Sequence, residues 1–270
     1  RKKWGFNRPY WVQYGDMLDH LFIKRDMISY QDQTEVLPTI ERGIPRTLSL
    51  AVGAAIIWTI FGVGIGVISG VQQGRFADRA LTILALGGIS TPIFWLGAVL
   101  LYLLTFRWHD SPLFHWVPAG GYVPIAQDPW QWAAHLAIPW LVLSVVSIGF
   151  YARVVRASLI ETRTADYVRT ARAMGLSSRR VLVRHVLRTS LIPVVTLLGL
   201  DFGAAVGGTV ILIEPIFGIE GVGQYAQESV THLDLPPLMA LTLYGAFFVV
   251  LCNALVDLTY AWLDPRIRLE

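Results

Sequence analysis

Lysine is almost missing from this chain of 270 residues, where it occurs only at Lys2, Lys3 and Lys24. A phosphate-binding loop of the Gly-x-x-x-x-Gly-Lys-Ser/Thr kind needs a lysine directly after its last glycine. No lysine lies downstream of residue 24 to supply it. If ATP drives this protein, the sequence therefore assigns the hydrolysis to another chain and predicts a non-catalytic role for this one.

Cysteine occurs once, as Cys252 inside an apolar block, which excludes an internal disulfide and indicates a small buried side chain. The histidines are scattered without the spacing of metal ligands, so the sequence predicts no metal site. The same scatter argues against an enzyme with its catalytic groups inside a bilayer. The histidines are His20, His109, His115, His135, His185 and His232.

Charged residues are also scarce, at 15% against a soluble norm of about 25%, whereas hydrophobic residues reach 54%. The apolar residues gather in uncharged blocks long enough to cross a bilayer. Such blocks argue against a nucleic-acid partner, although the formal net charge is +3. We expect an all-α polytopic membrane protein whose transmembrane domain covers residues 47–263. The five predicted spans are residues 47–70, 80–106, 136–152, 191–213 and 237–263.

The placement of arginine predicts the orientation of these spans, since cytoplasmic loops carry an excess of Lys and Arg. Thirteen arginines lie in the turn 71–79, in or beside the segment 156–190, and in the tail 264–270. The two loops on the opposite side carry only Arg107. We therefore expect the turn, the long segment and the tail to be cytoplasmic. Residues 1–46 are then extracytoplasmic despite eight Lys and Arg residues, which implies a missing first span that carries them across.

Glycines recur every fourth residue in the first and fourth spans, a spacing that lines one helix face with small residues and allows close helix packing. Pro92 and Pro139 are expected to kink the second and third spans. The glycines in question are Gly62, Gly66, Gly70, Gly199, Gly203 and Gly207.

Few polar residues lie deep in the predicted spans. Asp201 stands alone near the middle of the fourth span, where an ionisable group avoids lipid and faces the bundle or a wet cavity. Asn253 and Asp257 lie four residues apart on one face of the fifth span. We expect Asp201 to be a candidate for the translocation path and the other two to favour structural hydrogen bonds.

Residues 166–176 form the most informative polar segment between spans. Asp166 is expected to cap a short helix, and Gly175 to end it in a left-handed conformation. Residues 177–187 form a second basic and amphipathic helical run. Two interpretations remain open from the residues alone: an interfacial helix on anionic lipid, or a helix that docks in the groove of a cytoplasmic partner.

Residues 166–176 read Asp-Tyr-Val-Arg-Thr-Ala-Arg-Ala-Met-Gly-Leu and are followed by Arg184-His185. This pattern resembles the cytoplasmic coupling loop of ABC importer permeases, and most closely the first permease subunit of the oligopeptide, dipeptide and nickel group. Further landmarks of that family extend the resemblance over nearly the whole chain. They are Ser90-Thr91-Pro92, Pro118-Ala119-Gly120-Gly121-Tyr122, Glu214-Pro215-Ile216-Phe217, Gly221-Val222-Gly223 and the ending 257–268.

The resemblance implies a type I ABC importer transmembrane domain with six spans, of which this chain holds five, in a bacterial plasma membrane. It implies a second permease subunit, two cytoplasmic ATPase subunits that bind ATP and magnesium, and an extracytoplasmic binding protein. This chain itself would bind no cofactor and would act as the permease. The residues expected to contact the ATPase are Asp166, Tyr167, Arg169, Thr170, Ala171, Arg172, Ala173, Met174, Gly175 and Leu176.

Peptides are the solute that the resemblance favours, with nickel or another small solute as the alternative. Asp201, Glu214 and Asn253 are the candidates for the translocation path, and residues 216–236 for an outer gate or docking surface. A stand-alone ion-coupled carrier is a more distant alternative. It would need paired discontinuous helices and several charges deep in the membrane, whereas only Asp201 is deep.

Overall fold

The structure, a computed structural model, describes the backbone of residues 8–263 and the side chains of residues 8–259. Within this part of the chain the regular elements are helical, apart from one isolated bridge between Ile28 and Glu35. The predicted tail, residues 264–270, lies outside the described residues, as do residues 1–7 of the predicted external segment.

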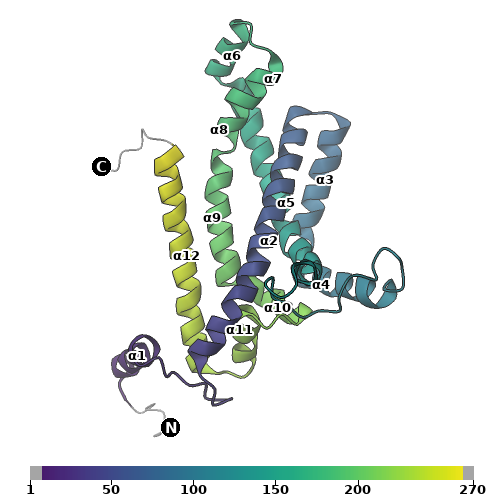
Figure 1. The fold of residues 1–270 in the computed structure, drawn as a ribbon. Coiled ribbons are helices and arrows are strands. Elements are labelled where there is room, and N and C mark those ends of the chain that lie inside the picture. Colours follow the sequence, from purple (N-terminus) through teal and green to yellow (C-terminus); the bar gives the residue numbers. More distant parts are fainter. Residues whose placement is uncertain (1–7, 264–270) are drawn as a thin grey trace.

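Four long helices run roughly side by side and define the molecule (Figure 1). They are α2 (Val36–Val71), α5 (Pro129–Thr164), α9 (Ile192–Gly207) and α12 (Leu235–Leu263). Helix α2 packs along α5, and α12 packs along α9. Within residues 8–263, four helices are long and apolar enough to cross a membrane, or up to five if one bent pair counts as a span.

A bent pair of helices occupies the second predicted span, 80–106, where one kinked helix was expected. Helix α3 (Phe76–Ser90) and helix α4 (Ile93–Tyr102) meet at an angle of 96°, which is a break and not a kink within one helix. Pro92 stands at the break, and Thr91 before it is extended with ψ 123°, as steric contact with a following proline favours. Helix α4 then packs against α5 and against the short helix α10 (Glu214–Phe217), and the π-helical turn Leu103–Arg107 continues it.

The fourth predicted span also ends earlier than expected. Helix α9 stops at Gly207, six residues before the predicted end at residue 213. Gly208 leaves the helical region with φ −164° and ψ −45°, and a single turn of 3₁₀ helix (Thr209–Leu212) follows. Two consecutive glycines weaken a helix because their backbone has the most conformational freedom to lose.

Helices α2 and α5 both extend beyond the predicted spans. Helix α5 begins at an Asp128 cap, whose carboxylate accepts hydrogen bonds from the backbone N–H groups of Trp130 and Gln131. It continues through Pro139 to Thr164, and both α2 and α5 are 36 residues long. Each helix is therefore longer than a bilayer core of roughly 30 Å requires.

Short helices close the two ends of the bundle (Figure 1). The α6 end carries α6 (Asp166–Ala173), α7 (Ser178–Val181), a π-helical turn (Leu182–Leu187) and α8 (Arg188–Ser190). The α11 end carries α1 (Tyr10–Leu18), a π-helical turn (Asp19–Ile23), α10 and α11 (Val222–Thr231).

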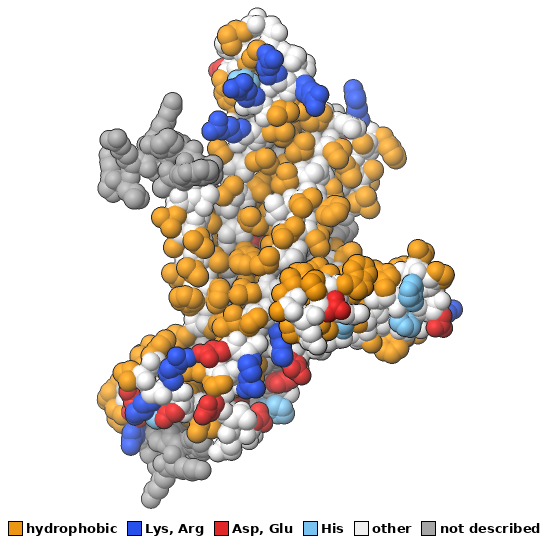
Figure 2. Space-filling view, in the orientation of Figure 1, with side chains coloured by type: hydrophobic (Ala, Val, Ile, Leu, Met, Phe, Trp, Pro, Cys, Tyr) orange, Lys and Arg blue, Asp and Glu red, His pale blue; other side chains and the backbone are white. Residues whose placement is uncertain are grey.

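Apolar side chains fill the bundle and also cover its flanks. The main core lies among α2, α5 and α9 and includes Trp58, Val142 and Tyr151, each at most 1% exposed. Figure 2 shows hydrophobic side chains over the outer surface of the long helices, with basic residues gathered at the α6 end and mixed charges at the α1 end. An apolar belt between two charged ends is the surface of a protein that spans a membrane.

Candidate functional site

The glycines of α2 lie against α5. A Cβ atom added at Gly66 would lie 2.6 Å from the Cβ of Val155, and one at Gly62 would lie 2.6 Å from the Cβ of Tyr151. At Gly70 an added Cβ would meet the Cδ2 atom of Leu159 at 3.0 Å. The absence of a side chain at these positions allows α2 and α5 to pack closely along this face.

The glycines of α9 lie in the same way against α12. An added Cβ at Gly203 would lie 3.1 Å from the Cβ of Cys252, and one at Gly207 would lie 3.0 Å from the carbonyl oxygen of Gly245. At Gly199 it would overlap the side chain of Val256. Cys252 is buried in this contact, at 5% exposed.

Helix α6 begins one residue away from the end of α5, and its first residue does not cap it as predicted. The cap position belongs to Ala165, extended with ψ 145°, and no side chain caps the helix. Asp166 is the first helical residue, and its exposed carboxylate lies 3.7 Å from the guanidinium of Arg169. A carboxylate in the first turn still interacts favourably with the helix dipole, although it accepts no capping bond.

Gly175 ends the short helix as predicted. Its φ of +82° lies in the left-handed region, which favours glycine because other residues meet steric strain there. The backbone N–H of Gly175 donates to the carbonyl of Arg172 at 2.9 Å, and that of Leu176 donates to Ala171 at 3.4 Å. The chain thus turns sharply between α6 and α7.

A small apolar cluster fixes α6 to the end of α5. Val168 and Ala171 of α6 are 0% and 2% exposed, and they pack with Leu159 of α5, Val181 and Val186. The opposite face of α6 is exposed and includes Arg169, Thr170, Arg172, Ala173 and Met174. Helix α6 therefore presents an exposed basic face, with Met174 at its C-terminal end, and projects beyond the long helices (Figure 1).

Asp201 lies in α9 and points away from the glycine face that contacts α12. The hydroxyl of Tyr151 in α5 and the indole N–H of Trp58 in α2 are buried without a hydrogen-bond partner among the described residues, and the Asp201 carboxylate lies in their neighbourhood. Asp201 is partly buried, whereas Tyr151 is 0% exposed. The three side chains bring polar groups of α2, α5 and α9 near one another inside the bundle.

Glu214 is completely buried at the α11 end, so its carboxylate does not face solvent in this conformation. It accepts hydrogen bonds from the hydroxyl of Thr47 at 2.6 Å and from the N–H of Gln224 at 3.0 Å. A Cβ atom at Gly221 or Gly223 would collide with the carboxylate oxygens, so these two glycines create its space. Burial raises the pKa of Glu214 to about 7. The hydrogen bonds from Thr47 and the backbone lower the pKa, but the effect of burial is larger.

The remaining polar candidates lie apart from these groups. Asn253 is half-buried in α12, and Asp257 one turn later is exposed. The structure does not join Asp201, Glu214 and Asn253 into one cluster, since Glu214 bonds only to Thr47 and the backbone near α11. Within residues 8–263, no three His, Cys, Asp or Glu side chains are grouped as a metal ion would require.

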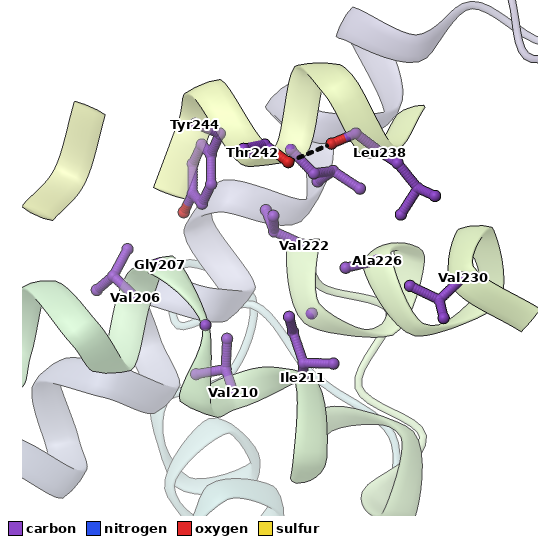
Figure 3. A pocket seen from close by; sticks show the side chains of 13 residues that line it. Val206, Gly207, Val210, Ile211, Val222, Ala226, Val230, Leu238, Thr242 and Tyr244 are labelled. Carbon is purple, nitrogen blue, oxygen red and sulfur yellow. Dashed lines mark hydrogen bonds between the residues drawn. The ribbon is translucent and has the colours of Figure 1, made fainter. Parts of the chain in front are cut away.

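An apolar pocket of about 160 Å³ opens between α9, α11 and α12 near Glu214. Figure 3 shows Val206, Val210, Ile211 and Val222 pointing into it, with Tyr244 at one side. Sequence analysis did not find this pocket. Its walls come from α9, the 3₁₀ turn Thr209–Leu212, α11 and α12, and the break of α9 at Gly208 lies in its lining.

Sequence analysis also missed an ion pair between Asp78 and Arg156, at the end of the bundle that carries α6. The sequence signal that could have indicated this ion pair was weak. Asp78 is the acidic residue of the turn 71–79, and a carboxylate next to a membrane span needs a partner if it is buried. Its partner lies 78 positions away, beyond the reach of any local pattern.

The profile of the family described as "Binding-protein-dependent transport system inner membrane component" matches residues 62–269. The probable peptide ABC transporter permease protein y4tP of Sinorhizobium fredii is 33% identical, over 99% of this chain and 83% of the relative. The dipeptide transport system permease protein DppB of Escherichia coli is 34% identical, over 98% of this chain and 83% of the relative.

Solved structures share the fold at lower identity. The inward-facing MetNI methionine ABC transporter superposes with a TM-score of 0.63 at 18% identity, covering 84% of this chain and 97% of that one. An amino acid ABC transporter gives a TM-score of 0.59 at 16% identity, covering 83% and 93%. The arrangement of the long helices is therefore that of a type I ABC importer transmembrane domain.

Proposed function

The chain belongs to the family of inner membrane components of binding-protein-dependent transport systems, and we propose that it forms half of the path by which such a system imports di- and oligopeptides. It is a multi-pass permease subunit of an ABC importer. Peptides are favoured as the solute because relatives named as peptide and dipeptide permeases are 33% and 34% identical along almost the whole chain. Nickel or another small solute on the same scaffold is the alternative.

The geometry of α6 is the main support for a role in coupling ATP hydrolysis to transport. Its buried residues, Val168 and Ala171, fix it to α5, and its exposed residues, Arg169, Arg172 and Met174, remain free for a partner. A helix that docks in a groove presents one such face. We assign residues 166–176 as the contact with a cytoplasmic ATPase subunit, which binds ATP and magnesium and performs the hydrolysis.

The charge distribution supports an orientation with the α6 end in the cytoplasm. Basic residues gather at this end, whereas the α1 end carries charges of both signs (Figure 2). An excess of Lys and Arg marks cytoplasmic loops. The segment 8–46 and α11 then face the outside, where residues 216–236 form the outer gate or the docking surface for a binding protein.

The mechanism follows from how α6 is attached. When two ATPase subunits close on ATP, they displace α6, and its apolar seat passes the displacement to α5. The long helices of this chain and of a second permease subunit then rock, which switches access between the outside and the cytoplasm. Asp201 and Asn253 are the candidates for solute contact on this path. Glu214 could make such a contact only after the α11 end opens.

Uptake measurements test the solute. The gene for this chain would be deleted in its host, and uptake of a radiolabelled dipeptide, a labelled pentapeptide and nickel ions would be compared before and after complementation. We expect peptide uptake to be lost and then restored. Unchanged peptide uptake together with lost nickel uptake would overturn the peptide assignment and favour the alternative.

Co-purification tests the partners. An affinity tag on this chain is expected to recover a second permease and the ATPase subunits from detergent extracts. Single cysteines at exposed positions such as Leu233, at 82% exposed, are expected to crosslink to the binding protein. A lone chain that transports without ATPase subunits would favour an ion-coupled carrier, and no crosslink in any nucleotide state would contradict the docking surface.

A further inference from the structure

An ion pair between a buried aspartate and a partly exposed arginine joins two helices near the α6 end. Asp78 lies in the first turn of α3 and is 3% exposed, and Arg156 lies in α5. The Nε of Arg156 donates to Oδ1 of Asp78 at 2.7 Å, and its Nη2 donates to Oδ2 at 2.9 Å. Two parallel bonds of this kind fix the orientation of both side chains as well as their distance.

The Asp78 carboxylate also holds the connection between α2 and α3. The hydroxyl of Ser69, in the last turn of α2, donates to Oδ1. The backbone N–H of Gly74, in the turn between the two helices, donates to Oδ2 at 2.9 Å. One carboxylate therefore accepts four hydrogen bonds from α2, the turn and α5. We call Asp78, Arg156 and Ser69 the clasp.

A second arginine of α5 reinforces the same connection. Nη1 of Arg163 donates to the carbonyl oxygen of Gly70 at 3.0 Å and to that of Val71 at 3.3 Å. The last carbonyls of a helix have no partner within the helix, so a cation placed there both pairs them and interacts favourably with the helix dipole. Helix α5 is thus bonded to the end of α2 directly through Arg163. About two helical turns earlier, Arg156 connects α5 to α2 indirectly, through Asp78 and Ser69.

The clasp lies close to the part of α5 that supports α6. Helix α5 continues without a break from Arg156 to Thr164, and α6 begins two residues later. The apolar cluster of Leu159, Val168 and Ala171 seats α6 on this last part of α5. The clasp is therefore the nearest ionic contact through which the support of α6 reaches other long helices.

We propose that the clasp transmits the displacement of α6 to α2 and α3, and that Asp78 and Arg156 are positioning residues for coupling between ATP hydrolysis and transport. The inference rests on the proposed function. A bidentate ion pair is directional, so it ties the orientation of α3, and through Ser69 the end of α2, to that of α5.

The test uses the complete importer, with its partner permease, ATPase subunits and binding protein, in vesicles. ATP hydrolysis and uptake of a labelled dipeptide are measured in the same preparation. The variants are Arg156→Lys, which keeps the charge and loses the paired geometry, and Asp78→Asn, which keeps the size and loses the charge. Arg153→Lys is the matched control, because Arg153 is an exposed arginine one turn earlier in α5.

We expect both clasp variants to assemble and hydrolyse ATP, but to import about fivefold less peptide per ATP or worse, which is the lower end of coupling between linked sites. Arg153→Lys should keep the normal ratio. Assembled clasp variants with a normal ratio would overturn the proposal. Failure of both variants to assemble would also overturn it, since the ion pair would then serve stability alone.

Failure of the proposed function has a different signature in the same experiment. In that case the unaltered importer itself would show no ATP hydrolysis stimulated by the binding protein, or no peptide uptake. The clasp proposal is judged only from the ratio of uptake to hydrolysis in variants, relative to an unaltered importer that performs both.

Discussion

The hydroxyl of Thr47 donates a 2.6 Å hydrogen bond to the carboxylate of Glu214, although the two residues are 167 positions apart. The same hydroxyl accepts a bond of 2.9 Å from the N–H of Val222. Thr47 therefore connects α2 to both α10 and α11. This single node fixes the segment 214–222 against the bundle, so the predicted outer gate is firmly packed in this conformation.

The raised pKa of Glu214 gives a pH dependence with a definite sign. The folded-state pKa is about 7 and the ordinary value is 4.5, so folding favours the protonated carboxyl. The stability should be greatest below about pH 4.5 and decline as the pH rises to about 7, by on the order of 3 kcal/mol. Glu214→Gln should flatten this decline in thermal unfolding of the detergent-solubilised protein. The exposed variant Glu161→Gln should retain it, and an unchanged slope in Glu214→Gln would contradict the assignment.

Gly175 should tolerate asparagine and reject a β-branched residue. A valine at φ +82° meets steric strain of about 1–2 kcal/mol, whereas asparagine adopts this conformation more readily. Gly175→Val should insert in the membrane normally and lose transport coupled to ATP hydrolysis, while Gly175→Asn should stay near normal. The measurements are membrane-fraction abundance and peptide uptake. Normal uptake in Gly175→Val would contradict the coupling role.

Gly66 of α2 offers a test of close helix packing, and Gly64 offers its matched control. An isoleucine at Gly66 would force its Cβ within 2.6 Å of Val155 Cβ and 2.7 Å of the carbonyl oxygen of Ala152. Overpacking of this kind costs about 1–3 kcal/mol. Gly64, two residues earlier, has no atom within 4 Å of an added Cβ. The thermal midpoint in detergent should therefore fall for Gly66→Ile and hold for Gly64→Ile, and an equal effect of both would refute close packing at Gly66.

Asp234 should hold the segment before α2 in place. Its carboxylate, 3% exposed, accepts from the hydroxyl of Ser29 at 2.5 Å and from the N–H of Tyr30 at 3.0 Å. Asp234→Ala removes the acceptor of the buried Ser29 hydroxyl, at a cost of about 1–3 kcal/mol. Limited proteolysis should then cleave within residues 24–35 faster. The exposed variant Asp32→Ala is the control and should leave the cleavage rate unchanged.

Much of the fold could be predicted because it depends on local patterns. The apolar blocks predicted the long helices, and the left-handed glycine at 175 predicted the end of α6. The cap at Asp166 was wrong because the chain enters α6 directly from α5, which leaves Ala165 at the cap position.

The misses share a physical cause, since each depends on contacts between distant segments. Pro92 predicts a disturbance, but the bend of 96° is set by the packing of α4 against α5 and α10. The burial of Glu214 depends on space made by Gly221 and Gly223 beneath α2. The pairing of Asp78 with Arg156 could likewise not be predicted from the sequence. Sequence spacing indicates which residues are unusual, and the tertiary structure determines their partners.

Arg156 lies off-centre along α5, close to the end that supports α6. At about 1.5 Å per residue, α5 extends about 40 Å from Arg156 toward Pro129 and about 12 Å toward Thr164. If the ion pair acts as a fulcrum, a displacement of α6 is amplified about threefold at the far end of the rigid helix. A shift of about one ångström at the short arm would then move the other end by about three, which exceeds the helix shifts of about 1–2 Å seen at subunit interfaces in switching proteins.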